Sequence, residues 1–121
     1  MIQVNLSQTS TGLIRRFTAT GHAGYGDFGE DILCAAVSAI AQTVIGSLQD
    51  IGGFNPTYTL QDGDIRCEIP DPQTLSAQQL ETARILMESF SVGCRQIEAT
   101  YGSDCITVKT KRFQAKGGAR A

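Results

Sequence analysis

The chain has 121 residues, which is long enough for one packed core and too short for two. With 41% hydrophobic and 18% charged residues, its composition excludes intrinsic disorder and fibrous repeats. The net charge of −2 hides an acidic body, because five of the ten basic residues lie in the last thirteen positions, and such a body excludes a dedicated nucleic-acid-binding domain. We expect one domain over residues 1–113 and a flexible basic tail over residues 114–121, which could touch RNA only weakly.

The first part of the chain predicts a β-hairpin, a loop and a helix. Apolar and polar residues alternate over residues 2–6 and 13–20, which predicts two strands joined by a turn. Four glycines within residues 21–29 predict a mobile loop, because neither a helix nor a central strand accepts them readily. Small and apolar residues at helical spacing then predict a well-buried helix from Asp31 to about Gln49.

The second part predicts another hairpin and a long helix. The Asp-Gly dipeptide at residues 62–63 suits a two-residue turn between strands at residues 57–60 and 65–69. Ser76, with Gln79 three positions later, matches a capping box at the start of a long amphipathic segment.

A last strand around Ile106 and Val108 completes the order ββαββαβ. Two helices that cover one face of a mainly antiparallel sheet give an α+β single domain. The second helix also carries Ile85, Leu86 and Val92 beside its main apolar stripe. Either that helix is deeply buried or it helps to form a dimer.

The longest apolar stretch, residues 32–45, is interrupted by Ser38, Gln42 and Thr43 and is shorter than the roughly 18 to 20 residues that a membrane span needs. The first residues offer neither the basic segment nor the continuous apolar run of a secretory signal. We therefore expect a cytoplasmic protein with no membrane partner.

The four cysteines stand too far apart for a zinc knuckle or a redox dithiol. One histidine and scattered carboxylates make no recognisable metal cluster, so we expect neither a metal nor a cofactor. Cys67, Cys94 and Cys105 fall on apolar strand and helix patterns, which predicts that they lie in the core. Cys34 is the exception.

His22 is the only histidine, so any reaction that needs an imidazole base at neutral pH must use it. It follows the second predicted strand and begins the glycine-rich loop. Cys34 comes next, in what we expect to be the first turn of the helix, where free N–H groups and the helix dipole favour a thiolate. The two side chains are candidates for a thiolate–imidazolium pair, although their spacing alone leaves an accidental juxtaposition open.

Two neighbours of Cys34 have both a chemical and a local interpretation. Asp31 could stabilise the imidazolium of His22, or it could cap the helix by accepting the N–H of Cys34, and we favour the cap. Ser38 lies four residues after Cys34 on the same helical face. It could hydrogen-bond into the site or to the helix backbone, and we favour the backbone.

The glycine-rich loop also fits the letters G-x-G-x-x-G over residues 24–29. A dinucleotide site is excluded, because the strand before it belongs to a hairpin and the acidic residues at the helix start would repel phosphate.

The segments GHAGYG at residues 21–26 and DILCAAVSA at residues 31–39 resemble the ribosomal-processing cysteine protease family Prp. The element order and the length agree with that family over nearly the whole chain. Leu33 departs mildly from the resemblance, since a β-branched Val or Ile is expected there. Beyond residue 53 the resemblance is one of pattern rather than of motif.

The resemblance implies a cysteine endopeptidase with Cys34 as nucleophile and His22 as base. Its substrate would be the N-terminal extension of a large-subunit ribosomal protein, bL27, and the enzyme would work as a homodimer. The loop that we expect to cover the site and to open on peptide binding comprises Gly21, Gly24, Tyr25, Gly26, Phe28 and Gly29. In it, Tyr25 and Phe28 are expected to meet apolar side chains of the substrate.

Two other functions stay open from the sequence. The chain could be a non-catalytic ribosome-associated module, with a packed Cys34 and an RNA-binding tail, since a fold does not fix a function. It could also be another small thiol hydrolase, acting on an amide or a thioester.

Overall fold

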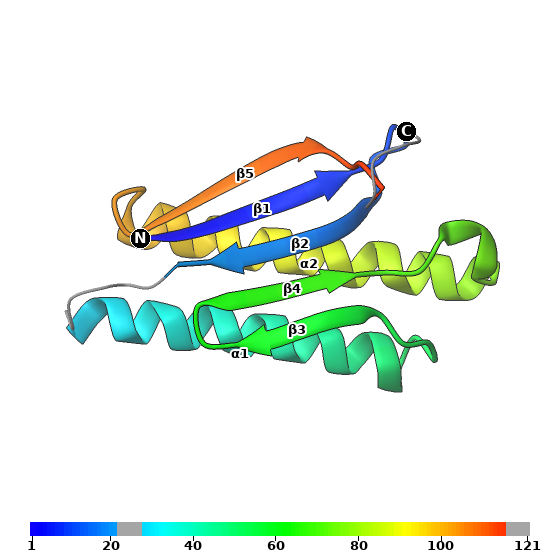
Figure 1. Ribbon diagram of the computed structural model, residues 1–121, viewed down its shortest axis with the longest axis horizontal. Helices are drawn as coiled ribbons and strands as arrows, with labels where there is room; N and C mark the ends of the chain where they lie inside the picture. The colour runs from blue at the N-terminus through cyan, green and yellow to red at the C-terminus, as the bar shows by residue number, and fades with distance from the viewer. Residues whose placement is uncertain (22–27, 116–121) are drawn as a thin grey trace.

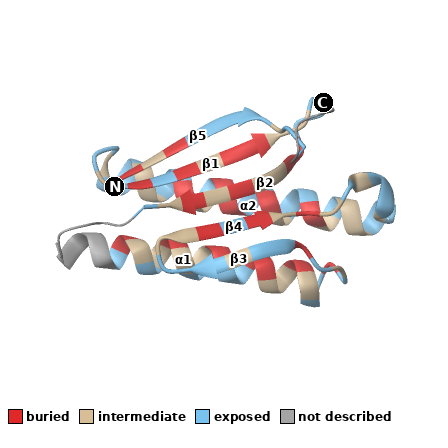
Figure 2. Ribbon diagram, in the orientation of Figure 1, coloured by how far each residue is buried: buried red, intermediate tan, exposed pale blue. Residues whose placement is uncertain are grey.

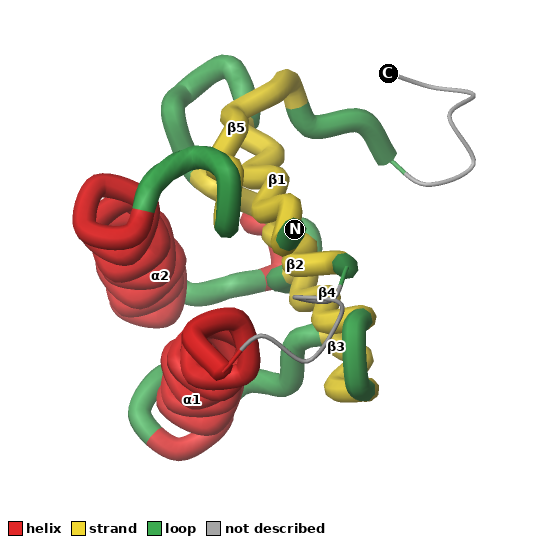
Figure 3. The backbone as a smooth tube through the Cα atoms, turned by 90° about the vertical axis from the view of Figure 1, so that its left-hand side faces the viewer, coloured by secondary structure: helices red, strands yellow, loops and turns green. Residues whose placement is uncertain are grey.

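A computed structural model describes residues 1–21 and 28–115, and the side chains of residues 1–21 and 32–115. One sheet of five strands is covered on one face by two long helices (Figures 1 and 3). The elements are β1 Ile2–Gln8, β2 Ile14–Thr20, α1 Phe28–Asp50, β3 Thr57–Gln61, β4 Asp64–Glu68, a short 3-10 helix Pro72–Thr74, α2 Ala77–Tyr101 and β5 Ile106–Arg112.

The strand order in the sheet is β3-β4-β2-β1-β5. Three of the four strand pairs are antiparallel, and only β1 with β5 is parallel. The parallel pair arises because α2 carries the chain back across the sheet before β5 begins. The predicted α+β fold, the order ββαββαβ and the mainly antiparallel sheet are therefore confirmed.

The core lies between the sheet and the two helices. Strand alternation turns Val4, Leu6 and Phe17 toward the helices, and each is at most 1% exposed. The Phe17 ring stacks on that of Phe90 in α2, with ring centroids 3.7 Å apart. Figure 2 shows buried residues concentrated in the central strands, whereas β3 contains none.

The start of α2 is fixed by the predicted capping box. The Ser76 hydroxyl accepts the N–H of Gln79 at 3.1 Å, and the Gln79 side-chain oxygen accepts the N–H of Ser76 at 2.9 Å. Farther along the helix, Ile85 and Val92 are each 50% exposed. The broad apolar stripe of this helix was explained either by deep burial or by a dimer interface, and deep burial does not account for these two exposed residues.

The helix α1 begins earlier than the sequence predicts, at Phe28 rather than at Asp31. Phe28 and Gly29 consequently belong to the helix and not to the preceding loop, which corrects the expectation for these two positions. A glycine is tolerated in the first turn, because its cost to a helix is greatest in the helix interior.

The stretch Ile32–Asp50 of α1 has 19 residues and a mean hydropathy of 1.6, so length and composition alone would let it cross a membrane. The expectation that no segment is long and apolar enough was wrong on this point. A helix in a protein core meets the same criterion. In this fold Leu33, Val37 and Leu48 are at most 2% exposed within the core.

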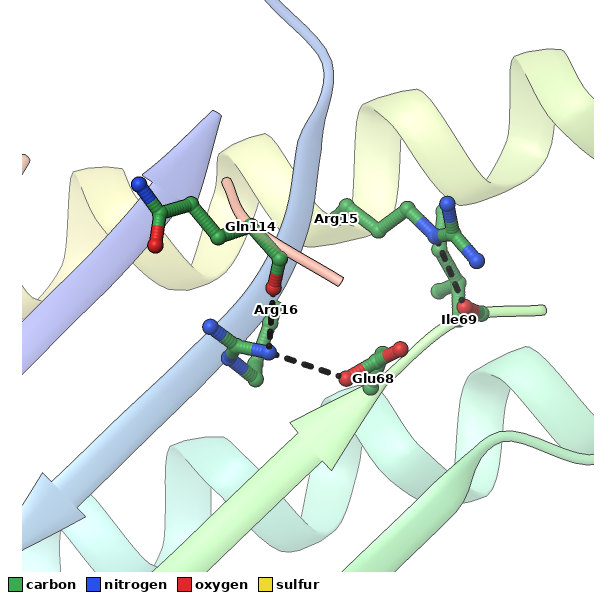
Figure 4. Close-up of polar contacts among 5 residues, drawn as sticks. All are labelled: Arg15, Arg16, Glu68, Ile69 and Gln114. Carbon is green, nitrogen blue, oxygen red and sulfur yellow. Dashed lines mark hydrogen bonds and ion pairs between the residues drawn. The ribbon is translucent and has the colours of Figure 1, made fainter. Parts of the chain in front are cut away.

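Two arginines of β2 contact the segments that follow β4 and β5 (Figure 4). Arg16 donates to Glu68 at 3.2 Å and to the carbonyl of Gln114 at 3.4 Å, and the neighbouring Arg15 donates to the carbonyl of Ile69 at 3.3 Å. Both guanidinium groups also lie over the ring of Phe113. Most of the expected basic tail, residues 116–121, lies outside the described residues, so its flexibility stays a prediction.

Candidate active site

Cys34 lies in the second turn of α1, because the helix begins at Phe28. The expectation that it occupies the first turn was wrong. The free N–H groups of a helix belong to its first turn, so Cys34 is not among the residues that carry them. Its thiol is half-buried and packs against the core cluster.

Ser38 lies one turn after Cys34 and is also half-buried. Side chains four residues apart share one face of a helix, so Ser38 borders the position of the thiol. On the same helix, Thr43 donates its hydroxyl to the carbonyl of Ala39 at 2.8 Å, which is the backbone role that we favoured for Ser38. The role of Ser38 itself stays a prediction.

Gly21, the residue before His22, is fixed at the end of β2. Its φ of 98° favours glycine, and a Cβ there would collide with the carbonyl oxygen of Met1. Its N–H donates to the carbonyl of Gly63 at 3.0 Å. The end of β2 and the start of α1 lie at the same end of the molecule (Figure 1). Gly21 and Cys34, the two ends of the segment that contains His22, therefore lie at the same end of the molecule.

The remaining site residues of the prediction lie outside the described parts of the chain. They are His22, Gly24, Tyr25 and Gly26, together with the side chains of Phe28 and Asp31. The pairing of His22 with Cys34, the cap or orienting role of Asp31, and the covering loop stay predictions.

Two of the other thiols, those of Cys67 and Cys94, are core residues as predicted, whereas Cys105 is only partly buried. Cys67 and Cys94 are fully buried, and burial raises the pKa of each thiol to about 12. Both therefore remain protonated at neutral pH and are poor nucleophiles. Cys105 is half-buried and packs against the core. Cys34 and Cys105 are thus the two partly exposed thiols.

Within the described side chains, no group of three or more His, Cys, Asp or Glu residues is placed to hold a metal ion. The described part of the chain accordingly offers no metal ligand set.

The turn between β3 and β4 borders this end of the molecule, and the sequence did not indicate its proximity. The dipeptide at residues 62–63 indicated only a hairpin turn. Gly63 reaches Gly21 because β2 pairs with β4, two strands that are not consecutive in the chain. Local sequence patterns carry no signal for such a pairing.

Comparison with known proteins gives one consistent family. The sequence model of the family described as Cysteine protease Prp matches residues 1–106. The ribosomal processing cysteine protease Prp of Bacillus subtilis is 27% identical over 101 residues, which cover 84% of this chain and 90% of that protein. The Staphylococcus aureus protein of the same name is 23% identical over 104 residues, which cover 86% and 94%.

Solved structures share the fold. A crystal structure of a Streptococcus mutans protein superposes with a TM-score of 0.77 at 24% identity, covering 93% of this chain and 96% of the other. Prp from S. aureus in complex with a substrate peptide superposes with a TM-score of 0.76 at 21% identity, covering 92% and 100%.

Proposed function

The chain belongs to the cysteine protease Prp family, and from this premise we propose that it is an endopeptidase in which Cys34 is the nucleophile and His22 the general base. The match over residues 1–106 includes both positions. The observation that carries the assignment is the placement of Cys34. Its thiol is half-buried on α1, at the end of the molecule where β2 delivers Gly21, the residue before His22.

The reaction proceeds in two steps. His22 takes the proton of the Cys34 thiol, and the sulfur attacks the scissile carbonyl carbon. The carbon–nitrogen bond then breaks, the proton passes from the imidazolium to the leaving amine, and a thioester remains. His22 next takes a proton from water while the oxygen of that water attacks the thioester carbon. The carbon–sulfur bond then breaks, the carboxyl product leaves, and the imidazolium returns its proton to the Cys34 sulfur.

The supporting groups follow from the position of Cys34. Because Cys34 lies beyond the first turn, the free N–H groups that could stabilise an oxyanion at the helix start stand before it in the chain. In this proposal Asp31 caps the helix and Ser38 bonds to the helix backbone, with orientation of the catalytic pair as the alternative role of each, and residues 21–27 cover the site until a peptide binds.

The proposed substrate is the N-terminal extension of the ribosomal protein bL27. The resemblance of the two motif segments supports this choice, and so do the names of the relatives, which are ribosomal processing proteases. S. aureus Prp was solved with a substrate peptide and with a covalently linked product peptide. We place the enzyme in the cytoplasm, as a homodimer, and the exposed Ile85 and Val92 on α2 are suited to an interface.

A synthetic peptide that spans the N-terminal extension of bL27 tests this function. We expect the wild-type chain to cut it once and the Cys34→Ala variant to leave it intact, as followed by mass spectrometry. Cys105→Ala is the matched control, because it removes the other partly exposed thiol, and it should retain cleavage. An uncut peptide with the wild type, or equal cleavage by Cys34→Ala, would refute the assignment.

A further inference from the structure

Strand β3 is a free edge of the sheet. It pairs with β4 on one side and is the first strand in the order β3-β4-β2-β1-β5. Among the described residues no other strand pairs with its outer edge, and the element behind it in Figure 1 is the helix α1. An edge strand presents a row of unpaired backbone groups that can pair with another extended chain.

The hydrogen-bond phase of the sheet shows which groups point outward. Two backbone hydrogen bonds flank the pairing of β2 with β4. The N–H of Gly21 donates to the carbonyl of Gly63, and the N–H of Ile69 donates to the carbonyl of Arg15, both at 3.0 Å. Odd-numbered residues of this segment therefore bond toward β2, and even-numbered residues bond toward β3. In the pairing of β3 with β4, Tyr58 lies opposite Cys67 and Leu60 lies opposite Ile65. The backbone groups of Tyr58 and Leu60 therefore point away from β4, toward the open edge of the sheet.

The side chains of these two residues form an apolar strip on the helix side of the sheet. Tyr58 lies opposite the buried Cys67, and Leu60 lies opposite the buried Ile65, which places both on the face that carries the core. Yet Tyr58 is 46% exposed and Leu60 is 39% exposed. Neither is covered as a core residue would be.

Cys34 lies on the flank of α1 that faces this strip. The opposite flank of the helix meets α2, where Ile40 and Leu86 line a shallow groove between the helices. At 3.6 residues per turn, Cys34 and Ser38 are on the far side of the buried Val37 from Ile40. Because α1 contacts β4, and β3 lies beyond β4, that flank is turned toward the edge strand (Figure 3).

The two elements also match in direction. α1 and β3 run antiparallel, so α1 begins at the end of the molecule where β3 ends (Figure 1), and Leu60 is the second-last residue of β3. A peptide lying along the edge would therefore lead from Tyr58 past Leu60 toward Cys34.

We propose that the substrate polypeptide binds as an added strand on the free edge of β3, pairing its backbone with Tyr58 and Leu60 and packing alternate apolar side chains against them. This inference rests on the proposed function and names the part of the chain that holds the substrate. It predicts a preference for an extended segment with apolar residues at alternate positions near the cleaved bond.

Amide hydrogen exchange tests the pairing directly. The sample is the Cys34→Ala variant with and without the bL27 N-terminal peptide. We expect the amides of Tyr58 and Leu60 to exchange at least about tenfold more slowly when the peptide is bound. The amides of Thr57 and Thr59 already pair with β4 and should not change. Peptide binding without added protection at Tyr58 and Leu60 would overturn the proposal.

Kinetics with surface variants test the side chains. Tyr58→Thr with Leu60→Thr should raise KM about tenfold and leave kcat nearly unchanged, because uniform binding is lost. Thr57→Ser with Thr59→Ser, on the opposite face of the same strand, is the matched control and should change neither. An unchanged KM in the first variant would overturn the proposal.

The outcomes separate this inference from the proposed function. If the wild type cleaves the peptide and the edge variants behave like it, only the edge site is refuted. If the wild type neither cleaves nor binds the peptide, both are refuted. Protection of Tyr58 and Leu60 that rises with protein concentration in the absence of peptide would assign the edge to a second copy of the chain and refute a substrate site there.

Discussion

The backbone N–H of Gly21 donates to the carbonyl of Gly63 over 3.0 Å, which joins the residue before His22 to the turn between β3 and β4. The same glycine lies against the carbonyl of Met1. Three separate parts of the chain therefore determine where the segment with the proposed base leaves the sheet. The same turn ends the strand that we propose to bind the substrate.

Replacement of Gly21 should reduce the stability of the fold. In Gly21→Ala the new Cβ meets the Met1 carbonyl and the backbone keeps a φ of 98°, so we expect a loss of about 1–3 kcal/mol in the free energy of unfolding. Urea denaturation measures the loss. Gly12→Ala is the matched control, because Gly12 has a similar φ of 92° but open space around it. Equal effects of the two changes would show that the Met1 contact is unimportant.

Alkylation should distinguish the four thiols. Iodoacetamide at neutral pH is expected to modify Cys34 fastest and Cys105 more slowly, with Cys67 and Cys94 unmodified in the folded protein. The reason is that burial raises the pKa of the two core thiols to about 12 and also blocks access. Peptide mapping by mass spectrometry reads the order. Labelling of Cys34 no faster than Cys105 would argue for a packed, non-catalytic thiol.

The buried thiols should also make the protein sensitive to alkali. The pKa of each rises from 9.0 to about 12 on folding, so the unfolded chain loses these protons first as the pH increases. Their contribution to stability is full below about pH 9 and is lost between about pH 9 and 12, at up to about 1.4 kcal/mol per pH unit for each thiol.

Urea unfolding from about pH 8 to 11 measures this slope. Cys67→Ala should reduce the slope of the unfolding free energy against pH by the contribution of one thiol, whatever its effect on absolute stability. A slope that does not differ between the variant and the wild type would contradict the raised pKa of the buried Cys67 thiol.

Loss of the sole imidazole should remove most of the activity. His22→Ala is expected to lower kcat by about 10²–10⁴-fold, because the thiol then lacks both its base and the acid for the leaving amine. The same change should slow the alkylation of Cys34 and leave that of Cys105 as in the wild type. A variant that cleaves at the wild-type rate would exclude His22 from the chemistry.

Much of the fold could be predicted because its signals are local. The capping box of Ser76 with Gln79 and the turn at residues 62–63 depend on contacts a few residues apart, and the buried Cys67 and Cys94 follow from apolar periodicity. The same local patterns gave the element order.

What could not be predicted depends on contacts between distant segments. The alternation in β3 marks Tyr58 and Leu60 as if they were core residues, but β3 lies at the edge and leaves them exposed. The start of α1 was placed three residues late, because the glycine in its first turn resembled a loop residue, and this misplaced Cys34 within the helix. The neighbourhood of Gly21 and Gly63 required the β2–β4 pairing.

The most direct measurement is the site of the covalent intermediate. The bL27 N-terminal peptide is mixed with the wild-type chain, the reaction is quenched with acid within the first turnover, and the adduct is mapped by mass spectrometry. We predict an acyl group on Cys34, absent from Cys34→Ala and retained in Cys105→Ala. An acyl group on another residue, or complete cleavage of the peptide by Cys34→Ala, would contradict the assignment of Cys34 as the nucleophile.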